Sequence, residues 1–169
     1  MSILVDIQML QTVSVTIASA SVVAGVVYYA LQLRHQAKIR QTEHVMRLYS
    51  AWGSDEYREA TFIFFTTDWN KYKDEVEQSP LIELLDKPVF QVYTKINLFF
   101  EGIGILLHRG LIDVELVEDM FSNLIKDSYE RVKPVVEGIR SRGKSQHYEW
   151  FEYLYNEMNR REQKLRPAT

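Results

Sequence analysis

Residues 7–33 read IQMLQTVSVTIASASVVAGVVYYALQL, and none of these 27 side chains carries a charge. As an α-helix, such a stretch is about 40 Å long at ~1.5 Å per residue, and the hydrocarbon core of a bilayer is about 30 Å thick. Its serine and threonine hydroxyls can bond back to carbonyls of their own helix, which makes them tolerable in lipid. The sequence therefore predicts one N-terminal transmembrane helix.

Basic residues follow this uncharged stretch and do not precede it. Asp6 is the only charged residue among the first 33, whereas Arg34, Lys38 and Arg40 come directly afterwards. Because cytoplasmic flanks of membrane spans carry an excess of Lys and Arg, we expect a single-pass protein of the cell (inner) membrane with its N-terminus outside and its C-terminal domain in the cytosol. The same three basic side chains are candidates for contacts with anionic lipid headgroups at the membrane surface.

Two other interpretations of the stretch stay open. A cleaved signal peptide would have a basic leader, which this chain lacks, although Ala18-Ser19-Ala20 resembles a cleavage site. A buried helix of a soluble protein rarely lacks charges over such a length. A lipid bilayer is therefore the expected surroundings of residues 7–33.

Small side chains recur within the stretch at helical spacing. They form a candidate association face, because small residues let two helices approach closely in lipid, where packing drives association. Small residues are also common in membrane spans for no such reason. If the face is functional, it predicts a homo-oligomer or a membrane-protein partner; its members are Thr16, Ala20, Ala24, Ser21 and Gly25.

The remainder of the 169-residue chain has the composition of a helical domain. The net charge is −3, which argues against nucleic acid as a partner, since such domains usually carry a basic excess. Cysteine is absent, so disulfides, thiolate metal sites and a thiol nucleophile are excluded. Only four prolines and seven glycines occur, which suits long helices. We expect an all-α protein whose transmembrane helix continues into a cytosolic helical bundle.

Local signals divide this part of the chain into helices. No Gly or Pro lies between Tyr28 and Ala51, so the first helix is expected to run beyond the membrane to Gly53. Ser54 and Asp113 are predicted N-caps, and Pro88 is predicted at the first position of a helix. That helix, 88–108, is apolar on nearly every side and is expected to be central and buried.

The later helices follow from similar signals. The helix opened at Asp113 is expected to kink or restart at Lys133-Pro134, and the last helix to run over about 147–161. The expected organisation is an N-terminal segment and transmembrane helix (1–33), a juxtamembrane helix (34–53), a helical bundle (54–161) and a basic C-terminal tail (162–169).

A polar stripe interrupts the apolar helix 88–108. Asn97, Glu101, Gly104 and His108 are spaced at i, i+4, i+7 and i+11 and therefore share one face. A buried carboxylate needs a partner, because an unpaired buried charge is costly. The candidate partners from other helices are Arg58, Arg140 and Arg142. The stripe is interpreted either as an internal network that fixes helix register or as a ligand or catalytic site centred on Glu101 and Asn97.

No other constellation in the sequence points to chemistry. The four histidines are dispersed and none forms Glu-x-x-His, so the pattern of a di-iron bundle is missing. Neither a phosphate-binding glycine loop nor a Gly-x-Ser-x-Gly turn occurs. We therefore predict no catalytic residue, no metal and no cofactor. Whether the protein is an enzyme stays open, and the sequence favours a protein that is not one.

The run INLFFEGIGILLHRGLID, residues 96–113, resembles the core of a family of small prokaryotic single-span membrane proteins known only as a domain of unknown function. The anchor with its basic flank and the segments 48–52, 140–142 and 151–154 fit the same layout. The resemblance implies a single-span helical protein and supplies no activity. The leading hypothesis is a membrane-tethered interaction module, either self-associating or an accessory subunit of a membrane complex. The alternative is a small-ligand-binding or hydrolytic helical domain centred on Glu101 and Asn97.

Overall fold

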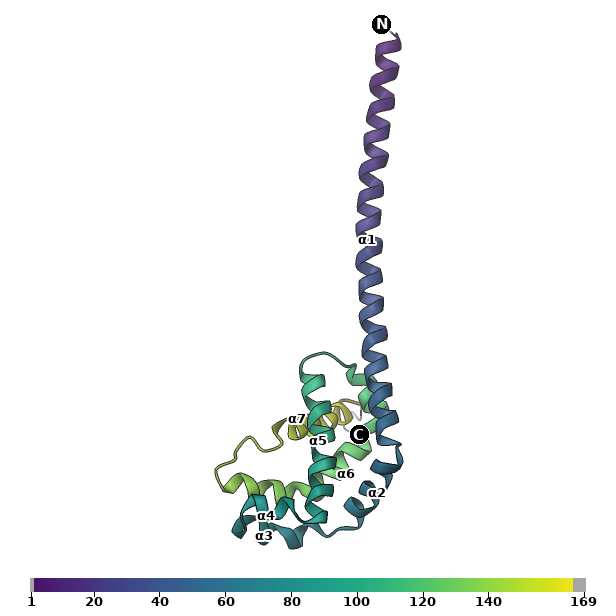
Figure 1. Ribbon diagram of the computed structural model, residues 1–169. Coiled ribbons are helices and arrows are strands. Elements are labelled where there is room, and N and C mark those ends of the chain that lie inside the picture. Colours follow the sequence, from purple (N-terminus) through teal and green to yellow (C-terminus); the bar gives the residue numbers. More distant parts are fainter. Residues whose placement is uncertain (1, 166–169) are drawn as a thin grey trace. The chain divides into compact units, whose positions relative to one another are not determined.

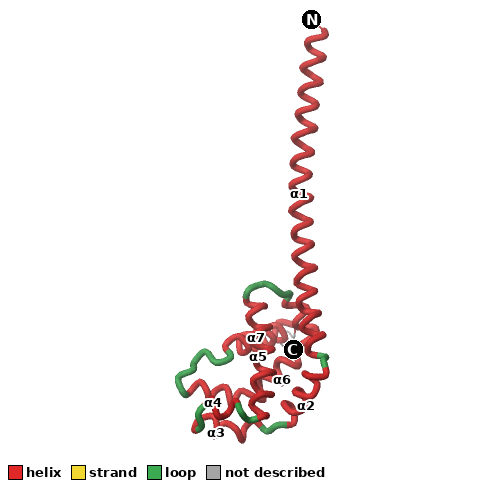
Figure 2. The backbone as a smooth tube through the Cα atoms, viewed as in Figure 1, coloured by secondary structure: helices red, strands yellow, loops and turns green. Residues whose placement is uncertain are grey.

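The computed structural model describes the backbone of residues 2–165 and the side chains of residues 9–80 and 83–164. Within that part of the chain all regular structure is helical, which confirms the all-α class. The elements, shown in Figures 1 and 2, are α1 (Ser2–Trp52), α2 (Asp55–Thr66), the 3₁₀ turn η1 (Trp69–Tyr72), α3 (Lys73–Gln78), α4 (Leu81–Leu85), α5 (Pro88–His108), α6 (Val114–Ser141) and α7 (Glu149–Leu165). Residues 166–169 of the predicted basic tail lie outside the described residues.

The chain divides into two compact units, residues 1–40 and residues 41–169. The boundary falls inside the segment 34–53 that the sequence predicts as a juxtamembrane helix.

In the first unit, α1 has no packing partner. Every described side chain from Met9 to Arg40 is exposed, and the helix is long and apolar enough to span a membrane. The hydroxyls of Ser14, Thr16, Ser19 and Ser21 each donate to the carbonyl four residues earlier at 2.8 Å. These four hydroxyls are thus bonded within the helix itself, which is the condition for placing them in lipid.

In the second unit, the last turns of α1 pack onto α5. Val45 is fully buried, and the Trp52 ring lies 5.0 and 5.2 Å from the rings of Phe99 and Phe100. α1 ends at Trp52, before Gly53, as predicted. The Ser54 side chain then accepts a hydrogen bond from the Tyr57 amide and caps α2, so the predicted N-cap is confirmed.

Helix α5 (teal in Figure 1) lies at the centre of the second unit, against α2, α4 and α7. Ile96, Phe100 and Ile103 are fully buried, and the Phe100 ring stacks on Phe151 of α7 at 4.9 Å. The expectation that α5 is buried on nearly every side is wrong for one face. Leu98 and Ile105 are 57% and 37% exposed, because neighbouring helices cover only part of its circumference.

Helix α6 begins at the predicted cap, where the Asp113 carboxylate accepts a hydrogen bond from the Glu115 amide at 2.8 Å. It continues through Pro134 to Ser141 as one helix and does not restart there. η1 and α3 pack against it. A Cβ atom on Gly138 would lie 2.9 Å from a methyl group of Val76, so the missing side chain permits this close packing.

Helix α7 begins two residues later than predicted and extends to Leu165. The predicted tail from residue 162 is therefore helical as far as the structure describes it. Ion pairs with α6 give the physical reason: Lys126 Nζ lies 2.7 Å from a Glu162 oxygen, and Arg161 pairs with Glu118. These contacts hold the last turn of α7 in place.

Candidate functional site at the start of helix α7

The polar stripe of α5 faces the beginning of α7. Glu101 Oε2 accepts a hydrogen bond from the Phe151 amide at 2.7 Å, and the Trp150 amide donates to the same carboxylate. The first amide groups of a helix have no partner within it, and the N-terminus of a helix carries a partial positive charge. Glu101 therefore caps α7 from a neighbouring helix.

Burial governs the ionisation of this carboxylate. Loss of solvent raises the pKa of Glu101 above its ordinary value, and this effect outweighs the lowering by the hydrogen bonds from Phe151 and Trp150. The nearby Glu149 raises the pKa further, and the Arg140 charge lowers it by a smaller amount. The charged form of Glu101 is therefore held by α7 at some cost in free energy.

Gly104 and His108 continue the same contact. A Cβ atom on Gly104 would lie 2.6 Å from the Trp150 carbonyl carbon, so the two backbones meet where any side chain would block them. The His108 ring packs on the Trp150 and Tyr153 rings at 4.5 and 5.4 Å. The stripe thus forms a docking surface for α7, which favours its structural interpretation.

The predicted arginine partners do not bond to Glu101. Arg140 donates to the His147 carbonyl at 2.9 Å and pairs with Glu152 at 2.6 Å. Arg142 donates to the carbonyls of Val76 and Ser79. The expectation of a direct Glu101–arginine pair is wrong because backbone amides of α7 occupy the carboxylate.

Three of the predicted buried polar residues, Arg58, His108 and Arg142, are exposed. Arg58 pairs with Asp55 one turn earlier, and its side chain is 78% exposed. His108 is exposed as well, since it packs on Trp150 at the rim of the α5–α7 contact. None of these three residues belongs to the interior.

Asn97 is the one polar side chain of the stripe that is fully buried, and Gly104 is buried beside it. Its side-chain amide donates to the Tyr93 carbonyl at 2.8 Å, while its Oδ1 atom has no protein partner within the described part of the chain. The same holds for Tyr93 Oη, Arg140 Nη2 and His147 Nε2. The charge of Arg140 lowers the pKa of both Tyr93 and His147, so these two side chains lie near the same guanidinium group.

Sequence reasoning missed Tyr93 and His147. Tyr93 reads as one more apolar residue of α5, and His147 lies outside any motif. The only usable signal is the concentration of Arg140, Arg142, Lys144 and His147 around the turn before α7.

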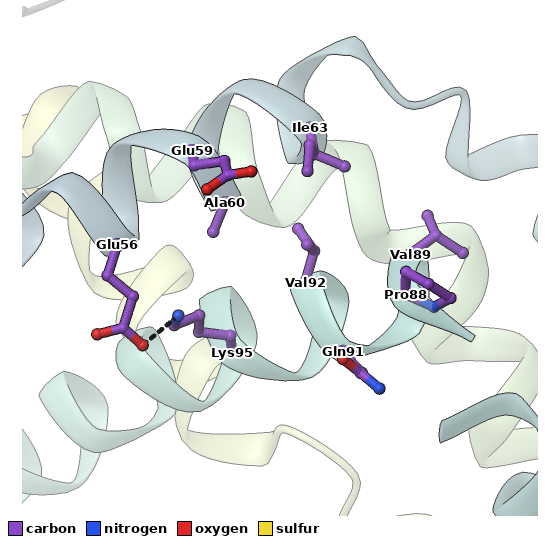
Figure 3. Close-up of a pocket in the computed structure, with 9 residues that line it drawn as sticks. All are labelled: Glu56, Glu59, Ala60, Ile63, Pro88, Val89, Gln91, Val92 and Lys95. Atoms are coloured by element: carbon purple, nitrogen blue, oxygen red, sulfur yellow. Dashed lines mark hydrogen bonds and ion pairs between the residues drawn. The ribbon is translucent and has the colours of Figure 1, made fainter. Parts of the chain in front are cut away.

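An open groove of about 520 Å³ lies between α2 and the first half of α5 (Figure 3). Lys95 of α5 pairs with Glu56 of α2 across one end of it. Apolar side chains and the Glu59 carboxylate line the rest; the lining residues besides Glu56, Glu59 and Lys95 are Ala60, Ile63, Pro88, Val89, Gln91 and Val92. The groove has a charged bridge at one end and lacks an arrangement of acid, base and nucleophile among these residues.

The predicted association face coincides in part with a shallow hollow along α1. The hollow is almost as open as a flat surface and is lined by Thr16, Ser19, Ala20, Val23, Ala24, Val27, Tyr28 and Leu31. Three members of the predicted face belong to it, whereas Ser21 and Gly25 do not. The candidate membrane-surface residues Arg34, Lys38 and Arg40 are exposed on α1 after the apolar stretch. Among the described residues, no group of three His, Cys, Asp or Glu side chains is placed to hold a metal ion.

A family model matches residues 18–158, from the middle of the apolar stretch to the penultimate turns of α7. The chain belongs to the DUF4760 family. DUF4760 is described as a domain of unknown function, so membership supplies no activity. Neither a curated protein nor a solved structure matches the chain. The DUF4760 region contains the α5–α7 docking surface, the α2–α5 groove and more than half of the uncharged stretch, so the family pattern extends into the candidate span.

Proposed function

We propose that this DUF4760 protein is a membrane-tethered helical interaction module that self-associates through one face of α1. The hollow along α1 is the observation that carries the proposal. Ala20 and Ala24 lie in it, and larger side chains such as Val23, Val27 and Leu31 border them. A second helix can enter such a hollow and gain close packing, which is what drives association in lipid.

A second copy of the chain is the occupant that this face fits best. The lining contains no charged residue, so it offers no group that selects a partner of opposite charge. An uncharged, small-residue face can meet its own copy about a two-fold axis, the commonest symmetry of homo-oligomers. A different membrane protein, with this chain as an accessory subunit, is the competing occupant.

The orientation is part of the proposal. Arg34, Lys38 and Arg40 follow the span and Asp6 precedes it, which supports a single-pass orientation with the helical domain in the cytosol; the proposed location is the inner membrane of a prokaryote. The proposal includes contacts of the exposed Arg34, Lys38 and Arg40 side chains with anionic headgroups on that side.

The alternative, a ligand-binding or hydrolytic site centred on Glu101 and Asn97, has less support. The Glu101 carboxylate is engaged by two backbone amides of α7, and the Asn97 side-chain amide is engaged by the Tyr93 carbonyl. A general base must be free to reach its substrate. Glu101 caps a helix instead.

Replacing small residues in the hollow tests the proposal. Ala20→Leu and Ala24→Leu together should lower self-association at least fivefold in a membrane dimerisation assay, because the added side chains fill the hollow. Ala18→Leu is the matched control, since Ala18 lies about half a turn away from Ala20 and outside the hollow.

The mass of the intact assembly in mild detergent separates the two occupants. A multiple of the chain mass of 19.9 kDa supports self-association, whereas a mass that includes another protein supports the accessory-subunit role. A monomer, or equal association of the Ala20/Ala24 and Ala18 variants, contradicts the proposal.

A further inference from the structure

One face of α5 is left uncovered by the other described helices of the second unit. Between residues 89 and 107 the exposed residues of α5 are Gln91, Leu98 and Ile105. They are seven residues apart and therefore form one stripe along the helix. Leu98 and Ile105 are 57% and 37% exposed, so two aliphatic side chains on one helix face remain in solvent. Their burial against another surface would be favourable.

Gly102 forms a notch between these two side chains. It follows Leu98 by four residues and precedes Ile105 by three, so the three residues are neighbours on the helix surface. A Cβ atom added to Gly102 would have no other atom within 4 Å, so packing inside the chain does not require a glycine here. Glycine in the middle of a helix is less stable than alanine. The position therefore gives up stability of the helix and leaves its backbone accessible.

An accessible glycine flanked by aliphatic side chains suits the close approach of a second helix. No side chain separates the two backbones where they cross at a glycine. Leu98 and Ile105 can then pack on either side of the crossing. Such a face is complementary to itself, because a two-fold axis at the crossing brings the same notch and the same aliphatic side chains of two copies together.

The charged residues beside this face are already engaged within the chain. Lys95 pairs with Glu56 of α2, and Glu101 accepts the hydrogen bond from the Phe151 amide. The centre of the face is uncharged, so it offers no group that selects a partner of opposite charge.

The size of the face favours a copy that is already held nearby. Stable interfaces use about 20–30 residues a side, and the notch with its two aliphatic neighbours is much smaller. Two copies joined through α1 need far less contact, because the linkage makes the second contact intramolecular. A tethered second copy therefore fits this face better than a partner that arrives from solution.

We propose that α5 forms a second contact between two copies of the protein. The two α5 helices cross at Gly102, and Leu98 and Ile105 of each copy pack against the other. This inference rests on the proposed self-association through α1 and adds a contact between the helical domains to the contact between the spans. Its role is to fix how the two helical domains face each other.

Cross-linking of the full-length protein in membranes tests this inference. The chain has no cysteine, so one introduced thiol reports one position. Leu98→Cys places the thiol about one helical turn from Gly102, where a short bismaleimide can join two copies. Asp127→Cys is the control, since Asp127 is exposed on α6, away from this face. We expect the Leu98→Cys protein to give about five times more covalent dimer than the Asp127→Cys protein.

Further changes in the Leu98→Cys protein assign the contact to the notch. Gly102→Leu should lower the yield of covalent dimer about fivefold, while the melting temperature holds or rises because the new side chain has space and favours the helix. Ile105→Glu changes an exposed position and should lower the yield as well. Asn123→Leu, which adds a leucine at an exposed position of α6, should leave the yield unchanged.

A membrane dimerisation assay of α1, run beside the cross-linking, separates this inference from the proposed function. Intact α1 association without a covalent dimer of the Leu98→Cys protein would overturn the α5 contact alone. A covalent dimer that depends on Gly102, in a protein whose α1 association does not respond to Ala20 and Ala24, would support the α5 contact and contradict the proposed α1 face. Equal yields from the two thiols, an unchanged yield in both the Gly102 and the Ile105 variants, or a covalent product with a different protein would also overturn the inference.

Discussion

Glu101 caps the N-terminus of α7, a helix to which it does not belong, whereas the capping residue usually lies directly before the helix. The residue before α7 is Tyr148, which is not one of the short polar residues that cap helices well. The carboxylate that meets the first amides of α7 comes instead from a position 50 residues earlier in the chain. The consequence is that α7 keeps its starting point only while it remains docked on α5.

Replacing Glu101 separates the hydrogen bond from the charge. Glu101→Gln keeps an acceptor oxygen and removes a charge that burial disfavours, so stability at pH 7 should change by less than about 1 kcal/mol. Glu101→Ala leaves the α7 amides without a partner and should cost about 1–3 kcal/mol. Thermal unfolding followed by circular dichroism measures both. A loss for the Gln variant as large as that for the Ala variant would mean that a charge pair dominates, as the sequence alone suggested.

Replacing Gly102 or Gly104 of α5 by alanine should change the stability of the protein in opposite directions. At Gly104 the new methyl group would press on the Trp150 carbonyl, and such overpacking costs about 1–3 kcal/mol or more. At Gly102 no atom lies within 4 Å of the new methyl group, so Gly102→Ala should stabilise the helix by up to about 1 kcal/mol. Unfolding temperatures of the two variants check the sign of each effect. Equal losses would refute the close α5–α7 approach.

The sequence located the site residues of α5 better than their partners. The spacing of Asn97, Glu101 and Gly104 marks one helix face, because helical periodicity is a local property. The partner of Glu101 depends on how three helices pack, and backbone amides carry no sequence signal. Arginines were therefore the natural candidates, although α7 itself fills that role.

At the scale of elements, the helix boundaries that were predicted correctly depend on local chemistry. Ser54 and Asp113 cap their own helices, and Pro88 opens α5, so neighbouring residues sufficed to predict them. The start of α7 follows a left-handed Tyr148, which no turn signal announces. Its end is held by ion pairs with α6, which are invisible before the fold is known.

The loop before α7 should make the second unit sensitive to acid. Because burial and the charges of Arg140 and Lys144 lower the pKa of His147 to about 4, the unfolded chain binds a proton more readily between that value and the ordinary ~6.5. Stability should therefore be constant above about pH 7 and fall as the pH drops through this window. With solvent screening, the loss at pH 5 should be about 1 kcal/mol.

Variants assign this acid sensitivity to one imidazole. His147→Gln should flatten the dependence of the unfolding temperature on pH between 7 and 5. His44→Gln, which changes an exposed histidine of α1, should leave the dependence as in the unmodified protein. An identical slope in all three proteins would show that His147 does not carry the effect.

At the scale of the whole molecule, the candidate span was the most predictable feature. The length of the uncharged run, residues 7–33, is a local property, so a helix long and apolar enough to span a membrane could be predicted without knowledge of tertiary contacts. The packing of the helical domain is less predictable, because it depends on contacts between side chains that are far apart in the sequence. The exposed face of α5 at Leu98 and Ile105 is an example that periodicity did not reveal.

Reporter fusions after Thr169 test the orientation of the protein. A fluorescent protein that matures only in the cytosol should be bright there, and a phosphatase that is active only outside the cytosol should be inactive. Replacing Arg34, Lys38 and Arg40 by Gln should raise the fraction of inverted molecules. An active phosphatase on the unmodified protein would reverse the proposed topology.

The cap that α5 provides for α7 also sets an order of events during synthesis. Glu101 leaves the ribosome before α7 does, since chains are made from the N-terminus at about 5–20 residues per second. Glu101 therefore lacks its partner amides for several seconds at least. During that time its carboxylate and the Gly104 surface are accessible to other molecules. The emergence of α7 is the step at which the domain can close. A chaperone or a neighbouring nascent chain would find its best opportunity just before it.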